Sequence, residues 1–375
     1  MAKKIFTRDE IEAFLVGLII YGTGGGGALL RGRNLMNNDF DHGRTLQMVD
    51  LEDVEDDAFI CSAGNMGSVK TAESVDYKQQ VQDWEENFPM LKAIEMMQQI
   101  KGRKVDYLIP FELGAGNTPI ILSAAARLGI PMINGDLVGR AAPETHMSSL
   151  IGHGISLYPM CLVDDSDNKF VIVDSNDPTY ADEVGRLLIK KGGNFGGNCH
   201  YPISGREAKR YCIGGSVSKA LELGKLVTDA NEKGIDGVEV VKEFTQAKEV
   251  FRGVITEFYG EDRGGFYLAN FKVEGTDGYR GKTATMVIKN ELMLLKVENK
   301  LRLMFPDYGF MLYPRTGHGI LSADLKPGLE IVLLGKPCHP LIRECMYDEV
   351  GRKAFGGSRY GYPDLEYVPI EDLEL

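Results

Sequence analysis

The 375-residue sequence has few of the features that mark membrane, secreted or zinc-ribbon proteins. Its six cysteines are scattered without a Cys-x-x-Cys pair, which argues against a disulfide framework and against a zinc ribbon. No apolar run reaches the roughly 20 residues that a membrane-spanning helix needs. Glu10 and Glu12 interrupt the apolar pattern at the start of the chain, unlike a signal peptide. We therefore expect a cytoplasmic protein.

Positive charge is also in short supply. The chain has 42 Lys and Arg against 54 Asp and Glu, a formal net charge of −12 and a pI of about 5.1. Nucleic acids and anionic membranes attract basic surfaces, so we expect neither as a partner. The length predicts two domains of ordinary size, each with its own core.

Nucleotide-binding motifs are absent, although four consecutive glycines lie near the start: Gly24, Gly25, Gly26 and Gly27. A Walker loop would end in Gly-Lys-Ser/Thr, and a dinucleotide fingerprint would follow a strand. Here the glycines follow a predicted helix that opens with a Thr7–Glu10 capping box and continues with apolar residues at helical spacing. The run is either a tight turn between helices or a loop whose backbone N–H groups bind an anion. We expect no binding of ATP or NAD.

Strands alternate with helices over the first 160 residues. Apolar runs end in polar turns around Asn65, at Glu112 to Asn117 and at Asn134 to Arg140, with a helix between the last two. The carboxyl ends of parallel strands meet at one edge of a sheet, so these three strand exits should lie side by side and hold a ligand. Ordinary turn formation is the alternative reading of each single Gly, Asn or Asp.

The hydrophobic pattern of the second half differs from that of the first. One more α/β unit and two helices follow residue 164, and beyond Phe251 apolar and polar residues alternate between glycine-rich turns. We expect an α/β N-terminal domain with a mostly parallel sheet over residues 1–163. Residues 164–375 should form a C-terminal domain that is largely antiparallel β with a few helices. The tail after residue 349, rich in turn residues and aromatics, should wrap over the surface without a helix.

Charged residues gather at the third strand exit. Asp136 and Glu144 flank Arg140, just before a helix predicted near Pro143. A guanidinium can keep one carboxylate ionised and leave the other free to titrate, as acid–base catalysis requires. A structural network that caps the helix is the alternative. Glu291 interrupts an apolar strand, so it faces either solvent or the other domain, with Arg140 as its expected partner there.

A metal ion would be another way to activate water. Cys199 and His200 lie in a segment that reads as a loop, and His146 lies on a predicted helix, seven residues before His153. Seven residues of helix span about 10 Å, so the two histidines cannot share an ion directly. Zinc held by Cys199, His200 and His146 is the candidate cofactor. Adjacent side chains usually diverge, however, and buried structural thiols are common, so we predict no obligatory metal.

Several motifs, taken in order, resemble the S-methyl thiohydantoin desulfurase-like family: GTGGGG, ELGAGNT, AARLGIPMINGDLVGRAAPE, GSVSKALELG, VIKNE, LSADLKPGLEIVLLGKP and EVGRKAFG. The resemblance covers nearly the whole chain. Its most specific segment is 129–144, where the matching residues are Asp136, Gly139, Arg140, Pro143 and Glu144. The chain departs from the family pattern at Leu137-Val138, where Gly-Met is usual, at Ala142, where Phe is usual, and at Ala28-Leu29, where Asp-Pro is common.

The resemblance implies a hydrolase for a five-membered cyclic thiohydantoin or hydantoin-like substrate, in which water attacks a ring carbon and a thiol leaves. On this reading Asp136, Arg140 and Glu144 are catalytic. The substrate-binding residues, in a cleft between the domains, are Gly24, Gly25, Gly26, Gly27, Glu112, Asn117 and Glu291. The alternatives are a non-catalytic ligand-binding or partner subunit of a hydantoinase-type system and a ring-opening cyclic-amide hydrolase. We also expect a homo-oligomer.

Overall fold

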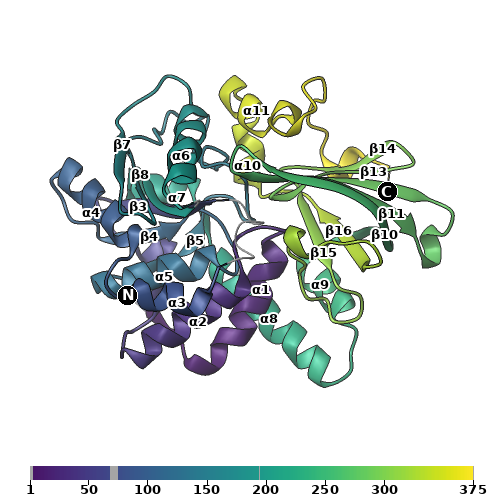
Figure 1. Cartoon of the computed structure of the whole chain (residues 1–375), viewed down its shortest axis with the longest axis horizontal. Helices are drawn as coiled ribbons and strands as arrows, with labels where there is room; N and C mark the ends of the chain where they lie inside the picture. Colours follow the sequence, from purple (N-terminus) through teal and green to yellow (C-terminus); the bar gives the residue numbers. More distant parts are fainter. Residues whose placement is uncertain (1–2, 68–74, 194, 375) are drawn as a thin grey trace.

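Two β-sheets organise the computed structural model, which describes residues 3–67, 75–193 and 195–374 (Figure 1). The larger sheet has the strand order β1-β2-β5-β4-β3-β8-β6-β7, and β9 pairs with β5 outside this path. Its strands are β1 Lys3–Ile5, β2 Gln47–Asp50, β3 Phe59–Gly67, β4 Tyr107–Pro110, β5 Met132–Asp136, β6 Met160–Asp164, β7 Lys169–Ile172, β8 Phe195–Ser204 and β9 Ile213–Gly214.

The core of this sheet is parallel. Strands β2, β5, β4 and β3 run in the same direction, whereas β1, β6, β7, β8 and β9 pair antiparallel at their flanks. The helices of this part are α1 Ile11–Tyr21, α2 Leu29–Asp41, α3 Tyr77–Asp83, α4 Pro89–Lys101, α5 Asn117–Leu128, α6 Tyr180–Lys191, α7 Gly205–Tyr211 and α8 Ser216–Glu232. The predicted α/β class is confirmed.

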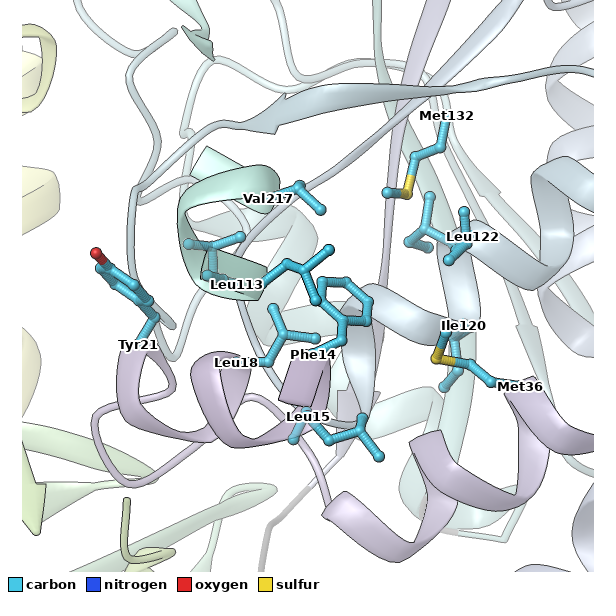
Figure 2. Packing of buried hydrophobic residues seen from close by; sticks show 14 of the residues in the cluster. Phe14, Leu15, Leu18, Tyr21, Met36, Leu113, Ile120, Leu122, Met132 and Val217 are labelled. Carbon is cyan, nitrogen blue, oxygen red and sulfur yellow. The ribbon is translucent and has the colours of Figure 1, made fainter. Parts of the chain in front are cut away.

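Helix α1 is buried almost all round because it packs against α8, α2 and the second sheet. Phe14, Leu15 and Leu18 pack into the core shown in Figure 2. Where α1 crosses α8 the backbones are in close contact, since a Cβ added at Gly17 would lie 1.7 Å from the Ala220 carbonyl oxygen. The helix predicted before the glycine run is confirmed, together with its Thr7–Glu10 capping box. Helix α1 thus holds the glycine loop in a fixed place.

The second sheet is entirely antiparallel, with the order β14-β13-β12-β11-β10-β16-β15, as predicted for the C-terminal part. Its strands are β10 Lys248–Arg263, β11 Phe266–Gly275, β12 Thr283–Lys289, β13 Glu291–Val297, β14 Lys300–Met304, β15 Tyr308–Leu312 and β16 Glu330–Lys336. Three helices accompany it: α9 Gly237–Thr245, α10 Pro340–Cys345 and α11 Glu349–Phe355.

The tail does contain a helix, contrary to the prediction. Helix α11 begins where the Asp348 carboxylate accepts a hydrogen bond from the Val350 N–H at 2.8 Å, and it buries Ala354 and Phe355 before Gly356 ends it. The N-cap and the buried apolar face stabilise this short helix, although the residues around it favour turns.

Strand β8 belongs to the larger sheet although it follows residue 163. It lies between β3 and β6, so the part of the sequence expected to open the second domain still contributes to the first sheet. The division at residue 163 stays a prediction. Within the described ranges, no helix combines the length and the apolar character needed to cross a membrane.

Candidate functional site

The three polar strand exits lie side by side, as predicted. The Asn65 amide, near the end of β3, donates a hydrogen bond to Asn117 Oδ1 at 3.4 Å, and Asn117 Nδ2 donates to Glu112 Oε1 at 2.7 Å. The other Glu112 oxygen accepts a hydrogen bond from the Ala142 N–H, also at 2.7 Å. The exits of β3, β4 and β5 therefore meet in one polar network around the Glu112 carboxyl.

The glycine loop packs directly against this network. The Gly26 carbonyl accepts hydrogen bonds from the N–H groups of Gly116 and Asn117, both at 3.0 Å, at the start of α5. Gly26 and Gly27 have positive φ angles, and a Cβ at Gly27 would lie 2.6 Å from Asn117 Oδ1. A side chain at either position would be strained and would collide, so close packing of two backbones requires these glycines. Gly24 lies behind them, where its carbonyl accepts a hydrogen bond from the Ser322 N–H at 2.8 Å.

A cavity of about 90 Å³ opens between the glycine loop, the strand exits and the second sheet. Its wall combines backbone of the loop with charged and amide side chains: Gly26, Gly27, Arg31, Asn65, Glu112, Asn117, Asp165, Arg186, Asn290 and Glu291. Residues from both sheets thus line one site. Five of the residues predicted to bind substrate are on this wall.

Two buried carboxyls, Glu112 and Glu291, line the cavity without a direct cation partner among the described residues. Glu291, the first residue of β13, reaches from the second sheet and packs on the loop so closely that a Cβ at Gly25 would lie 1.7 Å from its Oε1. Burial raises the pKa of Glu112 to about 7. Burial, reinforced by the nearby Glu112 charge, raises the pKa of Glu291 well above its ordinary value. Both carboxyls therefore keep their protons to higher pH than an exposed glutamate does.

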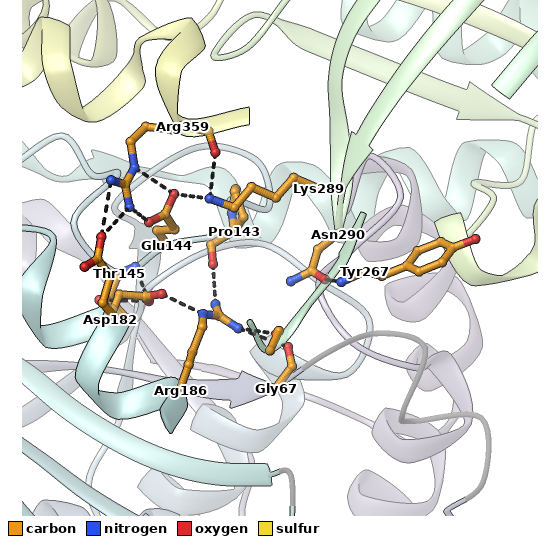
Figure 3. Close-up of polar contacts among 12 residues, drawn as sticks. Gly67, Pro143, Glu144, Thr145, Asp182, Arg186, Tyr267, Lys289, Asn290 and Arg359 are labelled. Atoms are coloured by element: carbon orange, nitrogen blue, oxygen red, sulfur yellow. Dashed lines mark hydrogen bonds and ion pairs between the residues drawn. The ribbon is translucent and has the colours of Figure 1, made fainter. Parts of the chain in front are cut away.

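The arginines of the cavity are held in different ways. The Arg31 guanidinium lies between the rings of Tyr77 and Phe195, at 4.9 and 4.6 Å from the ring centroids, and its Nε donates to Gln80 at 3.1 Å. Arg186 donates to Asp182 at 2.6 Å and also to the carbonyls of Pro143 and Gly265, which ties α6 to the irregular segment and to the second sheet (Figure 3). Arg186 therefore has little remaining capacity to bind a ligand.

The three residues predicted to be catalytic make separate sets of contacts. Asp136 accepts hydrogen bonds from the N–H groups of Val138 and Gly139 at 2.9 and 2.6 Å, and burial raises its pKa to about 6. Arg140 donates to the carbonyls of Leu292 and Asp307 in the second sheet. All three side chains are buried, and none of the three lines the cavity. Arg140 acts on Glu291 only through its charge, with no hydrogen bond or ion pair among the described contacts.

Glu144 lies in an ion-pair network with Lys289 of β12 and Arg359 of the tail (Figure 3). Burial alone would raise the pKa of Glu144, but the surrounding cations outweigh that effect and lower it to about 2. This carboxylate is therefore ionised at all ordinary pH values, in contrast to Glu112.

The helix predicted near Pro143 does not form. Residues 143–158 are irregular, and Gly152 and Gly154 adopt positive φ angles that a helix does not allow. Tertiary hydrogen bonds replace the helical ones, for example from the Ser149 N–H to the Leu137 carbonyl at 2.7 Å. His146 and His153 are consequently not on one helical stripe. His146 is fully buried, whereas the ring of His153 stacks on Tyr211 at 4.4 Å.

Cys199 and His200 lie in the central strand β8 and not in a loop. Their side chains diverge, because Cys199 packs in the core with Cys61 and Cys161 while the ring of His200 lies 5.6 Å from that of Phe111. In the part of the chain that the structure describes, no three His, Cys, Asp or Glu side chains are placed to hold a metal ion. The three zinc candidates Cys199, His200 and His146 are thus not brought together.

Sequence reasoning missed Arg31, Arg186, Lys289, Arg359 and Asn198. Arg31 carried a usable signal, since it stands in the first turn of the helix that follows the glycine loop. The others are contributed by elements far apart in the chain, and strand β8, which carries Asn198, was not predicted.

Comparison with known proteins matches residues 9–174 to the S-Me-THD-like N-terminal domain and residues 175–370 to the S-Me-THD-like C-terminal domain. No curated protein matches the chain. A crystal structure of a protein from Chromobacterium violaceum, determined by a structural genomics consortium, superposes with a TM-score of 0.77 at 20% identity and covers 98% of this chain and 100% of its own. That likeness shows a shared fold. The two domain matches together span nearly the whole chain, which therefore belongs to the S-Me-THD-like family, the family that its motifs resemble.

Proposed function

We propose that the protein is a hydrolase for a five-membered cyclic thiohydantoin or hydantoin-like substrate, adding water to a ring carbon and releasing a thiol. The observation that carries this proposal is the pair of buried carboxyls, Glu112 and Glu291, on the wall of one small cavity. Family membership supports the substrate class. A binding subunit that performs no chemistry would have no need to keep two acids unpaired inside such a cavity.

The two acids suit the two proton transfers of the reaction. Glu112 in its ionised form accepts a proton from water, and protonated Glu291 donates one to the ring nitrogen on which negative charge builds. The amides of Asn65 and Asn117, together with the backbone N–H groups of the glycine loop, would orient the ring carbonyl. The net change converts a carbon–sulfur bond into a carbonyl and yields one ring N–H and one thiol.

In this proposal Asp136, Arg140 and Glu144 position other groups instead of reacting with the substrate. Asp136 holds the turn after β5, Arg140 ties that turn to the second sheet, and Glu144 joins the two sheets through Lys289. In the proposal they fix the positions of the groups that line the cavity. Their direct participation in proton transfer stays a prediction, which Asp136→Asn tests below.

The deciding experiment incubates the purified protein with S-methyl thiohydantoins and with plain hydantoins, following thiol release and ring opening separately. Thiol release that Glu112→Gln abolishes supports the proposal. Ring opening without thiol release would instead identify a cyclic-amide hydrolase, and binding without turnover a ligand-binding subunit. A parallel sample treated with a chelator, with metal loss confirmed by elemental analysis, tests whether zinc is required.

A further inference from the structure

A second, smaller cavity lies directly behind the first. Its volume is about 20 Å³, and several polar residues line both cavities: Asn65, Glu112, Asn117 and Arg186. The polar residues that line only the inner cavity are Asn198, Glu144, Thr145 and Asp182, and Gly64 lies beside them. Glu112 therefore stands at the junction between the cavity that would hold a substrate and a pocket too small for anything but solvent. Roughly 10–15 Å³ is enough for one water molecule.

Asn198 is the unusual member of the inner wall. It lies in the central strand β8, opposite Gly64 of β3, and its side chain is fully buried. Neither its Oδ1 nor its Nδ2 has a hydrogen-bond partner among the described residues. Leaving a buried polar group unsatisfied costs about 1–3 kcal/mol, so an amide with two such atoms needs an occupant. A water bound there would accept a hydrogen bond from Asn198 Nδ2 or donate one to Asn198 Oδ1.

Gly64 keeps the space in front of this amide open. A Cβ at Gly64 would lie 3.7 Å from Asn198 Oδ1 and 3.5 Å from the Phe111 Cβ, both ordinary contact distances. The backbone at Gly64 has no positive φ angle that would demand glycine. An alanine at position 64 would therefore not collide with protein atoms. It would, however, reduce the space of the polar inner cavity, which explains why glycine stands here.

We propose that the inner cavity binds the water molecule that attacks the substrate, with Asn198 holding it beside Glu112. This inference rests on the proposed function and assigns the source of its nucleophile. A water between an amide and a carboxylate has the two to four polar partners that buried water requires. The ring in the outer cavity and the water in the inner one would then approach each other across Glu112.

The proton and bond changes balance. Glu112 takes one proton from the water as its oxygen bonds to the ring carbon, while Glu291 gives its proton to the ring nitrogen. When the carbon–sulfur bond breaks, the hydroxyl proton of the intermediate passes to Glu291, and the proton on Glu112 passes to the leaving sulfur. Both acids regain their starting state: one proton of the water ends on the thiol, and the other replaces the proton that Glu291 gave to the ring nitrogen.

Gly64→Ala tests this directly, because its methyl group takes up space in the inner cavity while meeting Asn198 Oδ1 and the Phe111 Cβ only at ordinary contact distances. We expect kcat for thiol release to fall on the order of a hundredfold with KM within about twofold, since positioning of the nucleophile is lost and the outer cavity is unchanged. Gly214→Ala is the matched control: its Cβ also meets ordinary contacts, 3.5 and 3.6 Å from Leu51, outside both cavities. A Gly64→Ala enzyme with unchanged kcat would overturn the inference.

Asn198→Leu separates water binding from a structural role. Removing an amide that makes no protein hydrogen bond should leave the thermal unfolding midpoint of the protein unlowered, while kcat falls as in Gly64→Ala. A lowered midpoint with normal kcat per folded molecule would mean that Asn198 supports the strand and binds no reacting water.

A high-resolution crystal structure gives a readout that does not depend on any substrate. The wild type should show an ordered water within hydrogen-bond distance of the Asn198 amide, and Gly64→Ala should lack it. If no ring substrate releases thiol but this water is present, the water site stands and the proposed reaction falls. If thiol is released but the inner cavity of the wild type holds no ordered water, the reaction stands and this inference falls.

Discussion

Glu112 and Glu144 are both buried carboxyls at the junction of the two sheets, yet their surroundings give them opposite properties. Glu144 contacts Lys289 and Arg359, and these cations together with the nearby His146 lower its pKa to about 2 against the effect of burial. Glu112 has amide and backbone donors but no contacting cation among the described residues, and burial raises its pKa to about 7. Burial alone therefore does not set the pKa of these two acids. The presence or absence of a contacting cation separates them.

The short turn between β12 and β13 supplies a residue to the Glu144 network and another to the cavity wall. Between β12 and β13, Lys289 points to Glu144, and two residues later Glu291 points into the cavity. Asn290, between them, has a φ of 58° and accepts a hydrogen bond from the Tyr267 N–H at 2.9 Å through its side chain. This turn of the second sheet thus supplies the cation that neutralises one carboxylate and the acid that partners the other.

The largest expected effect comes from Glu112→Gln, which keeps the shape and one oxygen to accept the Asn117 hydrogen bond, loses the hydrogen bond from the Ala142 N–H, and removes the base. We expect kcat for thiol release to fall on the order of a thousandfold with the far-UV circular dichroism unchanged. Asp136→Asn is the competing variant: its remaining side-chain oxygen can still accept the hydrogen bonds of Val138 and Gly139, so we expect a much smaller loss. A hundredfold loss in Asp136→Asn with near-normal Glu112→Gln would move the base to Asp136.

Glu144→Gln should affect stability more than chemistry. It leaves the buried Lys289 without its anion and the partly buried Arg359 with only the exposed Glu183, so we expect the free energy of unfolding to drop by about 3 kcal/mol in urea titrations. Glu183→Gln removes an exposed carboxylate that contacts the same Arg359, and it should cost less than about 1 kcal/mol. Equal costs for the two variants would contradict the structural role assigned to Glu144.

Gly25→Ala is expected to displace the Glu291 carboxyl, because the new Cβ would lie 1.7 Å from Oε1. Overpacking of this kind costs about 1–3 kcal/mol of stability and should also lower kcat. Gly278→Ala introduces the same methyl group where nothing lies within 4 Å, and neither stability nor turnover should fall. Normal turnover in Gly25→Ala would show that Glu291 does not need its present position.

The pH dependence provides the smallest and most specific test. A base acts in its ionised form, so kcat/KM should rise with pH through the Glu112 pKa of about 7, roughly fivefold between pH 6 and pH 7. Glu144 affects stability instead of rate. Because its pKa is lower in the folded protein than in the unfolded chain, it stabilises the fold at any pH above the unfolded-chain pKa, and this stabilisation is lost as the pH falls towards about 2. A flat rate profile between pH 6 and 8 would exclude Glu112 as the base.

The sequence predicted the parts of this arrangement that local patterns encode. Apolar runs ending in Asn65, Glu112 and Asn134 located three strand exits, and the antiparallel second sheet followed from simple alternation. Strand β8 was missed because its glycines weaken strand propensity. Those glycines are there because the sheet is tightly covered, since a Cβ at Gly197 would lie 2.7 Å from the backbone of Met90 in α4.

The same limit applies to the site. Glu112 and Asn117 could be named because they are neighbours in the sequence, and Glu291 because it breaks an apolar strand. Nothing local distinguishes Glu144 from Glu112, since Lys289 and Arg359 reach Glu144 from 145 and 215 residues away. The pKa of a buried acid depends on such distant contacts, so the choice of the catalytic carboxyl needed the fold.

Strand β8 has a consequence for how this family can change. It belongs to the C-terminal family domain, yet it pairs with β3 and β6 inside the sheet of the N-terminal one, and it carries Asn198. The border between the two matched domains, at residues 174 and 175, is therefore not a border between the two sheets. Exchanging one half alone would remove β8 from between β3 and β6, so the two halves should be engineered as one unit.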